Sequence, residues 1–269
     1  MTYLQAILLG IVQGITEFLP ISSDGHLVIF QHLFGLKQDM MFFDVMVHFA
    51  TLLVVFVYFR RDIAALIATF FGRNADAWPH TPGNGRRVVA WIVLGTIPAV
   101  FVGLFLKDAV ESTFKSVAFA GGGLLFTALL LTIGSRAGGG NKESSALSPA
   151  GALAIGIAQA IAPLPGVSRS GSTIATGLLL KLDRKEAARF SFLLAIPAIL
   201  GATVLELKDV LESGISDIGP VLVGMVVAFI AGMFALNLLV RVLQRGKLIW
   251  FAGYCVIAGI VAILLGIFS

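Results

Sequence analysis

The sequence predicts an all-α polytopic membrane protein with six full spans, built as an inverted-topology repeat in which each half holds one re-entrant helix pair and three transmembrane helices. Three observations lead to this fold: an apolar composition, six long apolar stretches, and an internal repeat. Of the 269 residues, 58% are hydrophobic and 13% are charged, and the mean hydropathy is +0.96. Soluble domains carry about 25% charged residues, and one this apolar could not cover its surface with polar groups.

Six apolar stretches approach the roughly 20 residues that a helix needs to cross a bilayer. They lie at 42–59, 88–106, 117–134, 186–206, 220–240 and 250–268. Polar, Gly-rich or charged segments, such as 107–116, separate most of them. The apolar segment 63–71 is too short to span, and we expect it to lie at the membrane interface.

Two further apolar regions, 3–35 and 150–180, are interrupted by polar breaks that contain helix-breaking and helix-capping residues. The first break runs from Pro20 to His26 and the second from Pro163 to Gly171. Each half of these regions is too short to cross a bilayer alone. Irregular backbone at membrane depth is tolerated only inside protein or beside a wet cavity. We therefore predict that each region is a re-entrant helix pair with its turn at depth.

The two interrupted regions are copies at a constant offset of 146 residues. Gly10 aligns with Gly156, Gln13 with Gln159, Ile15 with Ile161, Ser22 with Ser168 and Gly25 with Gly171. The repeats run over about 3–135 and 149–268 of a single membrane domain, 1–269. Since three spans follow each pair, the second repeat should enter from the opposite face, so that the two polar turns meet near the midplane.

The loop charges predict the orientation. If 60–87 is cytoplasmic, alternation places 135–149, 181–189 and 241–249 on the same side, and these segments hold 14 Lys and Arg against 4 on the other side. This split follows the positive-inside rule, and it puts both termini outside the cytoplasm. Arg60, Arg61 and the basic cluster at 181–189 are then interfacial topology determinants. The net charge of +4 is explained in the same way, so nucleic acid is not an expected partner.

Ionisable residues within the membrane are costly and are treated as functional candidates. The first polar break brings Glu17, Asp24 and His26 together with two serines, Ser22 and Ser23. The helix before it places Gln13 four residues before Glu17, hence on the same helix face. Together these groups suit proton transfer and nucleophilic attack.

The second break has a different character, because its one charge is Arg169, with Ser168, Ser170 and Thr173 around it. A buried guanidinium needs a partner, which is Glu17, Asp24 or an anionic ligand. Free N–H groups at a helix start near residue 172, hydroxyls and a forked cation form a good phosphate receptor. Gly166 and Gly171 allow the backbone to pass close to a ligand. The two breaks together predict phosphate-ester or anhydride chemistry.

Several of these residues also have plainer interpretations. Ser22, Ser23 and Asp24 are suited to cap the helix that follows residue 25. Arg169 could serve only as a structural partner of Glu17, and His26 only as a packed side chain. Glycines four apart, such as Gly10 and Gly14, more often mark close helix packing than phosphate cradles. Asp44 and His48 share a helix face and are expected to support the site or the structure.

No Cys/His constellation suggests a transition metal, and no organic cofactor is indicated. A metal, if one is used, would be a hard cation such as Mg²⁺ or Ca²⁺ bound by Glu17 and phosphate oxygens, with Asp24 as a second candidate ligand.

At these residues the chain resembles the bacterial undecaprenyl-diphosphatase family, the bacitracin-resistance type of lipid pyrophosphate phosphatase. The resemblance covers nearly the whole chain and is strongest at Gln13–His26, Pro165–Gly171 and Phe190–Pro197. It implies a multi-pass protein of the bacterial cell membrane that hydrolyses undecaprenyl pyrophosphate to undecaprenyl phosphate and inorganic phosphate. That reaction recycles the lipid carrier for peptidoglycan synthesis. The resemblance also implies a site that opens toward the outer face.

The resemblance assigns roles to residues of both breaks. It implies that Gln13 and Glu17 form the family's Glu/Gln-x-x-x-Glu motif, that Ser23 and His26 are catalytic, and that Arg169 anchors phosphate. Whether Ser23 or His26 attacks phosphorus stays open. Two departures stand out. Many members have Glu where this chain has Gln13, so the first carboxylate of the motif is missing here and cannot act as a base or metal ligand. Thr or Ser is more usual where this chain has Asp24. Asp24 either restores a negative charge near the site or weakens phosphate binding by repulsion.

Two rival functions follow from the same sequence. Inverted repeats with turns at mid-depth are also a transporter architecture, so the chain could be a transporter or a polyprenyl-phosphate flippase that binds a carried anion through Arg169. A purely structural scaffold is a weaker rival, because it gives Glu17, His26 and Arg169 no reason to lie at membrane depth. The expected partners are the polyprenyl pyrophosphate substrate and membrane lipids, with a second copy of the chain as a further candidate.

Overall fold

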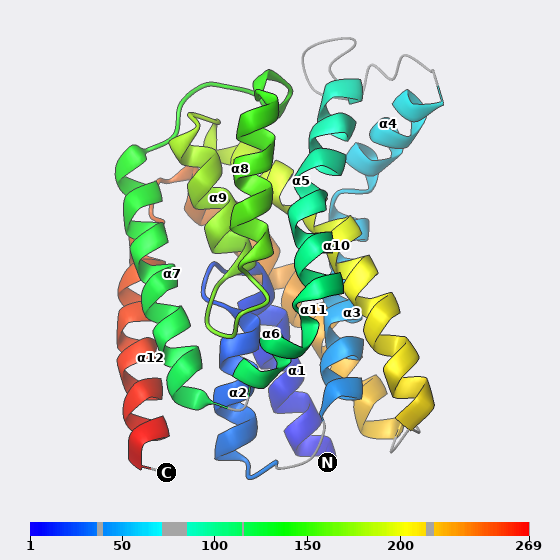
Figure 1. Ribbon diagram of the computed structural model, residues 1–269, viewed down its shortest axis with the longest axis vertical. Coiled ribbons are helices and arrows are strands. Elements are labelled where there is room, and N and C mark those ends of the chain that lie inside the picture. The colour runs from blue at the N-terminus through cyan, green and yellow to red at the C-terminus, as the bar shows by residue number, and fades with distance from the viewer. Residues whose placement is uncertain (37–39, 72–84, 115, 214–217, 269) are drawn as a thin grey trace.

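A computed structural model of the chain describes residues 1–36, 40–71, 85–114, 116–213 and 218–268, and these residues are almost entirely helical. The first half contains α1 (Tyr3–Phe18), α2 (Ser23–Leu33), α3 (Met41–Tyr58), α4 (Arg60–Phe70), α5 (Gly85–Phe105), α6 (Lys107–Thr113) and α7 (Val117–Ala137). After a 3₁₀ turn, η1 (Ser144–Ala146), the second half contains α8 (Pro149–Ala160), α9 (Arg169–Leu179), α10 (Arg184–Ser213), α11 (Ile218–Gln244) and α12 (Ile249–Phe268). Figure 1 shows them packed side by side as one elongated bundle.

The described residues confirm the six predicted membrane spans. Helices α3, α5, α7, α10, α11 and α12 are each long and apolar enough to cross a bilayer. Helix α10 begins before its apolar stretch because the Asp183 carboxylate accepts hydrogen bonds from the N–H groups of Lys185 and Glu186, which caps the helix start. The polar segment 107–116 also contains a short helix, α6, that the hydropathy pattern did not reveal.

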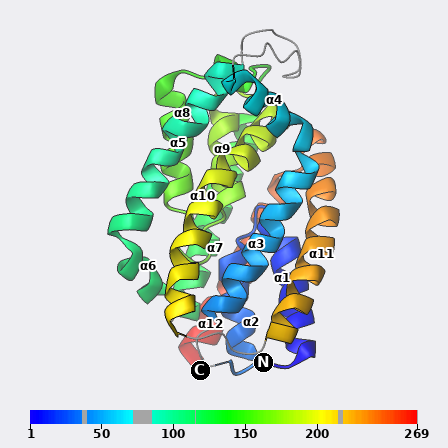
Figure 2. The ribbon, with the colours of Figure 1, turned by 90° about the vertical axis from the view of Figure 1, so that its right-hand side faces the viewer.

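The two interrupted regions form helical hairpins that enter the bundle from opposite ends. Helices α1 and α2 approach from the end where both chain termini lie, and α8 and α9 approach from the other end (Figures 1 and 2). At 1.5 Å per residue, the 16 residues of α1 extend about 24 Å and the 12 of α8 about 18 Å, both short of a bilayer core of about 30 Å. Each hairpin therefore turns inside the bundle.

Each hairpin packs against a long helix from the other half of the chain. Helix α1 lies along α11, α8 lies along α5, and the long helices α7 and α12 pack against each other. Glycines permit the close approach: a methyl group added at Gly10 would lie 2.6 Å from the carbonyl oxygen of Gly224, and one at Gly156 would lie 2.4 Å from that of Gly95. The interpretation of Gly10 and Gly14 as packing residues is thereby confirmed.

Arg189 corrects one sequence-based expectation. The basic cluster at 181–189 was interpreted as a set of interfacial topology determinants, but the Arg189 side chain is buried. It forms ion pairs with Asp62 of α4 and with Glu186 one turn earlier in α10. The prediction was wrong for this residue because Asp62 lies 127 positions away, so hydropathy and loop charge do not indicate the pair.

Candidate active site

The first polar turn is held by an N-cap serine. Ser22 precedes α2 with a φ of 68°, and its hydroxyl oxygen accepts a hydrogen bond from the N–H of Gly25 at 3.2 Å. The predicted capping role is confirmed for Ser22, although the helix begins at Ser23 instead of after residue 25. Ser23 and Asp24 therefore lie in the first helical turn, where their side chains are available for other contacts.

The second polar turn repeats this arrangement at the predicted offset. Ser168 caps α9, and its hydroxyl accepts from the N–H of Gly171 at 3.1 Å. The helix begins at Arg169, a few residues before the expected start. Thr127 of α7 fixes the turn, since its hydroxyl donates to the Gly166 carbonyl at 2.8 Å and accepts from the Ser168 N–H at 2.9 Å. Thr127 gave no sequence signal, because a hydroxyl in an apolar helix commonly bonds to its own backbone, as Thr132 of the same helix does to the Ala128 carbonyl.

The two turns touch each other inside the bundle. Gly166 has a φ of +90°, and a methyl group there would lie 1.9 Å from the Ala120 carbonyl oxygen of α7, so only glycine fits. A methyl group at Gly25 would lie 2.8 Å from the Cα of Gly166. These close backbone contacts bring the first residues of α2 and α9, and hence the chemistry of both turns, to one place.

Glu17 links the two turns. Its Oε1 accepts from Nη2 of Arg169 at 2.5 Å, and its Oε2 accepts from the Ser23 hydroxyl at 2.7 Å and from Nε2 of Gln13 at 3.2 Å. All four side chains are largely buried. Of the partners proposed from the sequence for Arg169, the structure therefore selects Glu17.

The ion pair with Glu17 uses only one of the two terminal nitrogens of the Arg169 guanidinium. Its Nη1 is buried and has no hydrogen-bond partner among the described residues. The guanidinium carbon lies 5.8 Å from the ring centre of Phe192, within the range of a cation–π contact. A buried donor without a partner costs about 1–3 kcal/mol, so this nitrogen is suited to receive an anionic ligand.

His26 is held from both ring nitrogens. Its Nδ1 lies 2.7 Å from the carbonyl oxygen of Ser22, which can only accept, so Nδ1 carries a proton. In the neutral ring, Nε2 then accepts from the hydroxyl of Tyr254, also at 2.7 Å, and the two rings stack at an angle of 11°. Tyr254 lies on α12, 228 positions away, and the sequence gave no indication of this contact.

His48 lies closer to the site than the sequence implied. Its Nδ1 donates to the Asp44 carbonyl at 2.7 Å, while Nε2 lies 3.2 Å from Oδ1 of Asp24 and 3.6 Å from Oε2 of Glu17. With acceptors on both nitrogens, the ring favours the doubly protonated, cationic form. Asp24 is therefore balanced by His48 and does not stand as an isolated negative charge.

The remaining predicted phosphate-binding residues line the start of α9 and are buried. The Ser170 hydroxyl lies 3.3 Å from that of Ser168 and 3.4 Å from the Leu19 carbonyl oxygen. The Thr173 hydroxyl lies 2.5 Å from that of Ser191 on α10 and donates to the Arg169 carbonyl at 2.8 Å. The Thr173 hydroxyl is thus already bonded to protein groups. The first N–H groups of α9, in contrast, have no hydrogen-bond acceptor within the helix.

The described residues contain no group of three or more His, Cys, Asp and Glu side chains placed to hold a metal ion. One protein oxygen beside Glu17 lacks a hydrogen bond: Oε1 of Gln13 is buried and unpartnered. Mg²⁺ is commonly held by one or two protein oxygens together with ligand phosphates and water. Gln13 and Glu17 therefore fit a cation that arrives with a phosphate ligand.

Comparison with known proteins gives a consistent result. The family model described as bacitracin resistance protein BacA matches residues 6–261. The chain is 44% identical to an undecaprenyl-diphosphatase of Desulfosudis oleivorans and 40% identical to one of Carboxydothermus hydrogenoformans, and each match covers 98% of both chains. An undecaprenyl-diphosphatase of Methanosphaera stadtmanae is 41% identical, again over 98% of both chains. The chain therefore belongs to the bacitracin resistance protein BacA family.

Proposed function

We propose that this membrane protein is a phosphatase that hydrolyses undecaprenyl pyrophosphate to undecaprenyl phosphate and inorganic phosphate, and so recycles the lipid carrier for peptidoglycan synthesis. Two relatives that match over 98% of both chains are named undecaprenyl-diphosphatase. The observation that carries the proposal is the continuous contact from Ser23 through Glu17 to Arg169, which joins a nucleophile, a base and a phosphate anchor from the two turns.

Arg169 and the start of α9 would bind the pyrophosphate. The unpartnered Nη1 of Arg169 is available to an oxygen of the terminal phosphate. The first N–H groups of α9 and the hydroxyls of Ser168 and Ser170 add uncharged donors at a helix N-terminus, where the helix dipole also favours an anion. These donors are fixed by capping and packing, so they would stabilise the charge of the transition state without reorganising.

The geometry favours Ser23 over His26 as the nucleophile. The Ser23 hydroxyl already donates to Glu17, the arrangement in which a carboxylate removes the proton as the oxygen attacks. The His26 ring nitrogens face Ser22 and Tyr254 instead. His26 would fix the backbone at Ser22 and so position Ser23.

The reaction then has two steps. Ser23 Oγ bonds to the terminal phosphorus as its proton passes to Glu17. The bond from that phosphorus to the bridging oxygen breaks, and its electron pair leaves with undecaprenyl phosphate. In the second step a water oxygen bonds to the phosphorus, and the protons of that water stay on the phosphate oxygens. The bond to Ser23 Oγ breaks, Glu17 returns the proton to Oγ, and inorganic phosphate is released as its dihydrogen ion.

A divalent cation, Mg²⁺ or Ca²⁺, would accompany the pyrophosphate. Glu17 and the Gln13 carbonyl oxygen are the protein groups that fit it, and it would supply charge neutralisation on the phosphate oxygens. The unpartnered oxygen of the Gln13 amide would then be a ligand of this cation.

We also propose that the chain is a single domain of two inverted repeats, about 3–135 and 149–268, with re-entrant hairpins whose turns lie near the membrane midplane. The reciprocal packing of α1 on α11 and α8 on α5 supports this, as do the matching serine caps. The basic loops would face the cytoplasm of a bacterial cell, and the site would open toward the outer face. The end of α4 and the loops after α7, α9 and α11 lie at one end of the bundle in Figure 1, in keeping with that orientation.

The test is phosphate release by the purified protein from undecaprenyl pyrophosphate in detergent, with divalent cation present and with a chelator. We expect one phosphate per substrate molecule, and strongly reduced release by Glu17→Gln, which keeps the shape of the side chain but removes the base. A flippase or transporter would release no phosphate in detergent. Wild-type protein that moves the lipid across vesicles without hydrolysis would overturn the proposal.

A further inference from the structure

The segment Phe190–Pro197, in which the chain resembles the family as strongly as in the two polar turns, lies in α10 and reaches the site through Phe192. The Phe192 side chain is fully buried, and its ring centre lies 5.8 Å from the guanidinium carbon of Arg169. Helix α10 packs against α9, which begins at Arg169. It therefore adds a contact to Arg169 beyond those made by the two turns.

The ring of Phe192 is held between two other aromatic side chains. Its centre lies 5.8 Å from that of Phe18, the residue that follows Glu17 in α1. It also lies 6.0 Å from the ring centre of Phe59, directly after α3, at an angle of 28° between the two rings. Rings in such contact pack with defined geometry, so the Phe192 ring has little freedom to turn away from the guanidinium.

The backbone of α10 is fixed against α9 at the same level. The hydroxyls of Ser191 and Thr173 lie 2.5 Å apart. Because the Thr173 hydroxyl donates its one proton to the Arg169 carbonyl, the Ser191 hydroxyl is the donor between them. The residue before Phe192 is thus bonded to the turn of α9 that carries Arg169.

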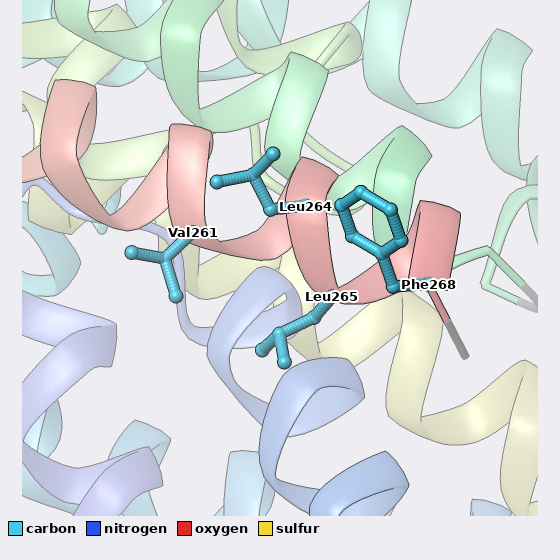
Figure 3. Close-up of a pocket in the computed structure, with 4 residues that line it drawn as sticks. All are labelled: Val261, Leu264, Leu265 and Phe268. Atoms are coloured by element: carbon cyan, nitrogen blue, oxygen red, sulfur yellow. The ribbon is translucent and has the colours of Figure 1, made fainter.

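The burial of Phe192 distinguishes it from the apolar side chains on the outside of the bundle. An exposed apolar surface on a membrane-spanning helix faces lipid tails, which are as apolar as the side chains. The groove on α12 in Figure 3 is such a surface, lined by Val261, Leu264, Leu265 and Phe268. Phe192 lies instead inside the protein beside a charged group, so its ring acts on that group.

We propose that Phe192 is a positioning residue for Arg169 and holds the guanidinium so that Nη1 faces the terminal phosphate of the substrate. The inference rests on the proposed function. Glu17 binds Nη2 at 2.5 Å, and the electron-rich ring face attracts the cation from a second direction. The ring also offers no oxygen or nitrogen acceptor to Nη1, which therefore stays available to the ligand.

The test replaces the ring by an aliphatic side chain. Phe192→Leu keeps an apolar group in the core but removes the ring face from Arg169. We expect kcat/KM for phosphate release from undecaprenyl pyrophosphate, per folded molecule, to fall about tenfold. The Kd for methylenediphosphonate, a pyrophosphate analogue whose P–C–P bridge is not hydrolysed, should rise by about the same factor, as measured by calorimetry in detergent.

Phe190→Leu is the matched control. Phe190 lies two residues earlier in α10 and is 0% exposed, as Phe192 is, but among the described residues its ring makes no contact with Arg169. The same loss of buried volume should lower the Tm of both variants. We expect kcat/KM and Kd per folded molecule in Phe190→Leu to stay within about twofold of the wild type. Equal losses in the two variants would overturn the proposal.

A double-mutant cycle shows whether Phe192 acts through Arg169. Lysine presents no planar fork to the ring, so adding Phe192→Leu to Arg169→Lys should cost less than about twofold more. Fully additive losses would overturn the proposal, as would a Phe192→Leu variant with the wild-type Kd and kcat/KM. The Kd comparison does not depend on hydrolysis. A wild-type protein that binds methylenediphosphonate but releases no phosphate would refute the proposed function alone, and the Kd values would still decide the role of Phe192.

Discussion

Two buried arginines of this protein form ion pairs of different character. Arg189 uses both ends of its guanidinium: one nitrogen pairs with Asp62, and the other donates to Oε1 of Glu186 at 3.2 Å. The second oxygen of Glu186 accepts from the hydroxyl and the N–H of Ser144. Both carboxylates are thus paired within the protein, and the group joins α4, α10 and η1.

Arg169 shares its one carboxylate with other donors and leaves Nη1 without a partner among the described residues. The oxygens of Glu17 also serve Ser23 and Gln13, and the free oxygen of Gln13 is buried. Unsatisfied groups destabilise a fold, so they are expected where a ligand completes them. The comparison indicates that burial of an arginine in a membrane bundle does not by itself reveal a site, whereas an unpartnered guanidinium nitrogen next to Glu17 and Ser23 points to one.

Ser23→Ala should have the largest effect, because it removes the proposed nucleophile from the incomplete group. We expect kcat for phosphate release to fall by roughly 10⁶-fold. Binding of a non-hydrolysed pyrophosphate analogue should persist, since Arg169 is intact. Near-normal turnover would instead assign the attack to His26.

Arg169→Lys should have the next largest effect. Lysine keeps the charge but has no fork to reach Glu17 and phosphate together. We expect a loss of about 10²-fold in kcat/KM, measured by phosphate release at saturating and limiting substrate. A fully active lysine variant would show that charge alone is sufficient and that the unpaired nitrogen has no role.

These effects could be partly predicted from the sequence. The six spans, the hairpins and the pairing of Arg169 with the first turn follow from hydropathy, the 146-residue repeat and the cost of a buried charge. Tyr254 and Thr127 could not be predicted, because each lies in an apolar helix and its partner is on a distant segment of the chain. The His48–Asp24 contact was foreseen only as general support, since helix periodicity gives a face but not its partner.

Tyr254→Phe tests whether the hydroxyl that contacts His26 contributes to the rate. It keeps the ring that stacks on His26 and removes the hydroxyl, so His26 loses one hydrogen bond worth about 1 kcal/mol. We expect kcat to fall about fivefold, with KM changed less. A separate check is the histidine ring signal in an NMR spectrum, which should shift in Tyr254→Phe; an unchanged signal and rate would remove Tyr254 from the site.

Asp24→Asn should have the smallest effect. Asp24 is partly exposed, and its ion pair with His48 is of a kind that contributes little free energy. We expect kcat/KM to change by about twofold, because His48 still contacts Glu17. A tenfold increase in phosphate affinity would instead show that Asp24 repels the substrate.

The most direct test measures Arg169→Ala and Arg189→Ala side by side, recording phosphate release per folded molecule and the Tm in detergent for each. Arg169→Ala should lose activity with a smaller fall in Tm than Arg189→Ala, because Ser23, Gln13 and His48 still contact the Glu17 carboxylate that it leaves behind. Arg189→Ala should lose stability, by about 3–5 kcal/mol for a broken buried pair, while its folded molecules keep their activity. An Arg169→Ala variant with the wild-type rate, or an Arg189→Ala variant that is stable but inactive, would contradict the division between a structural and a substrate-binding arginine.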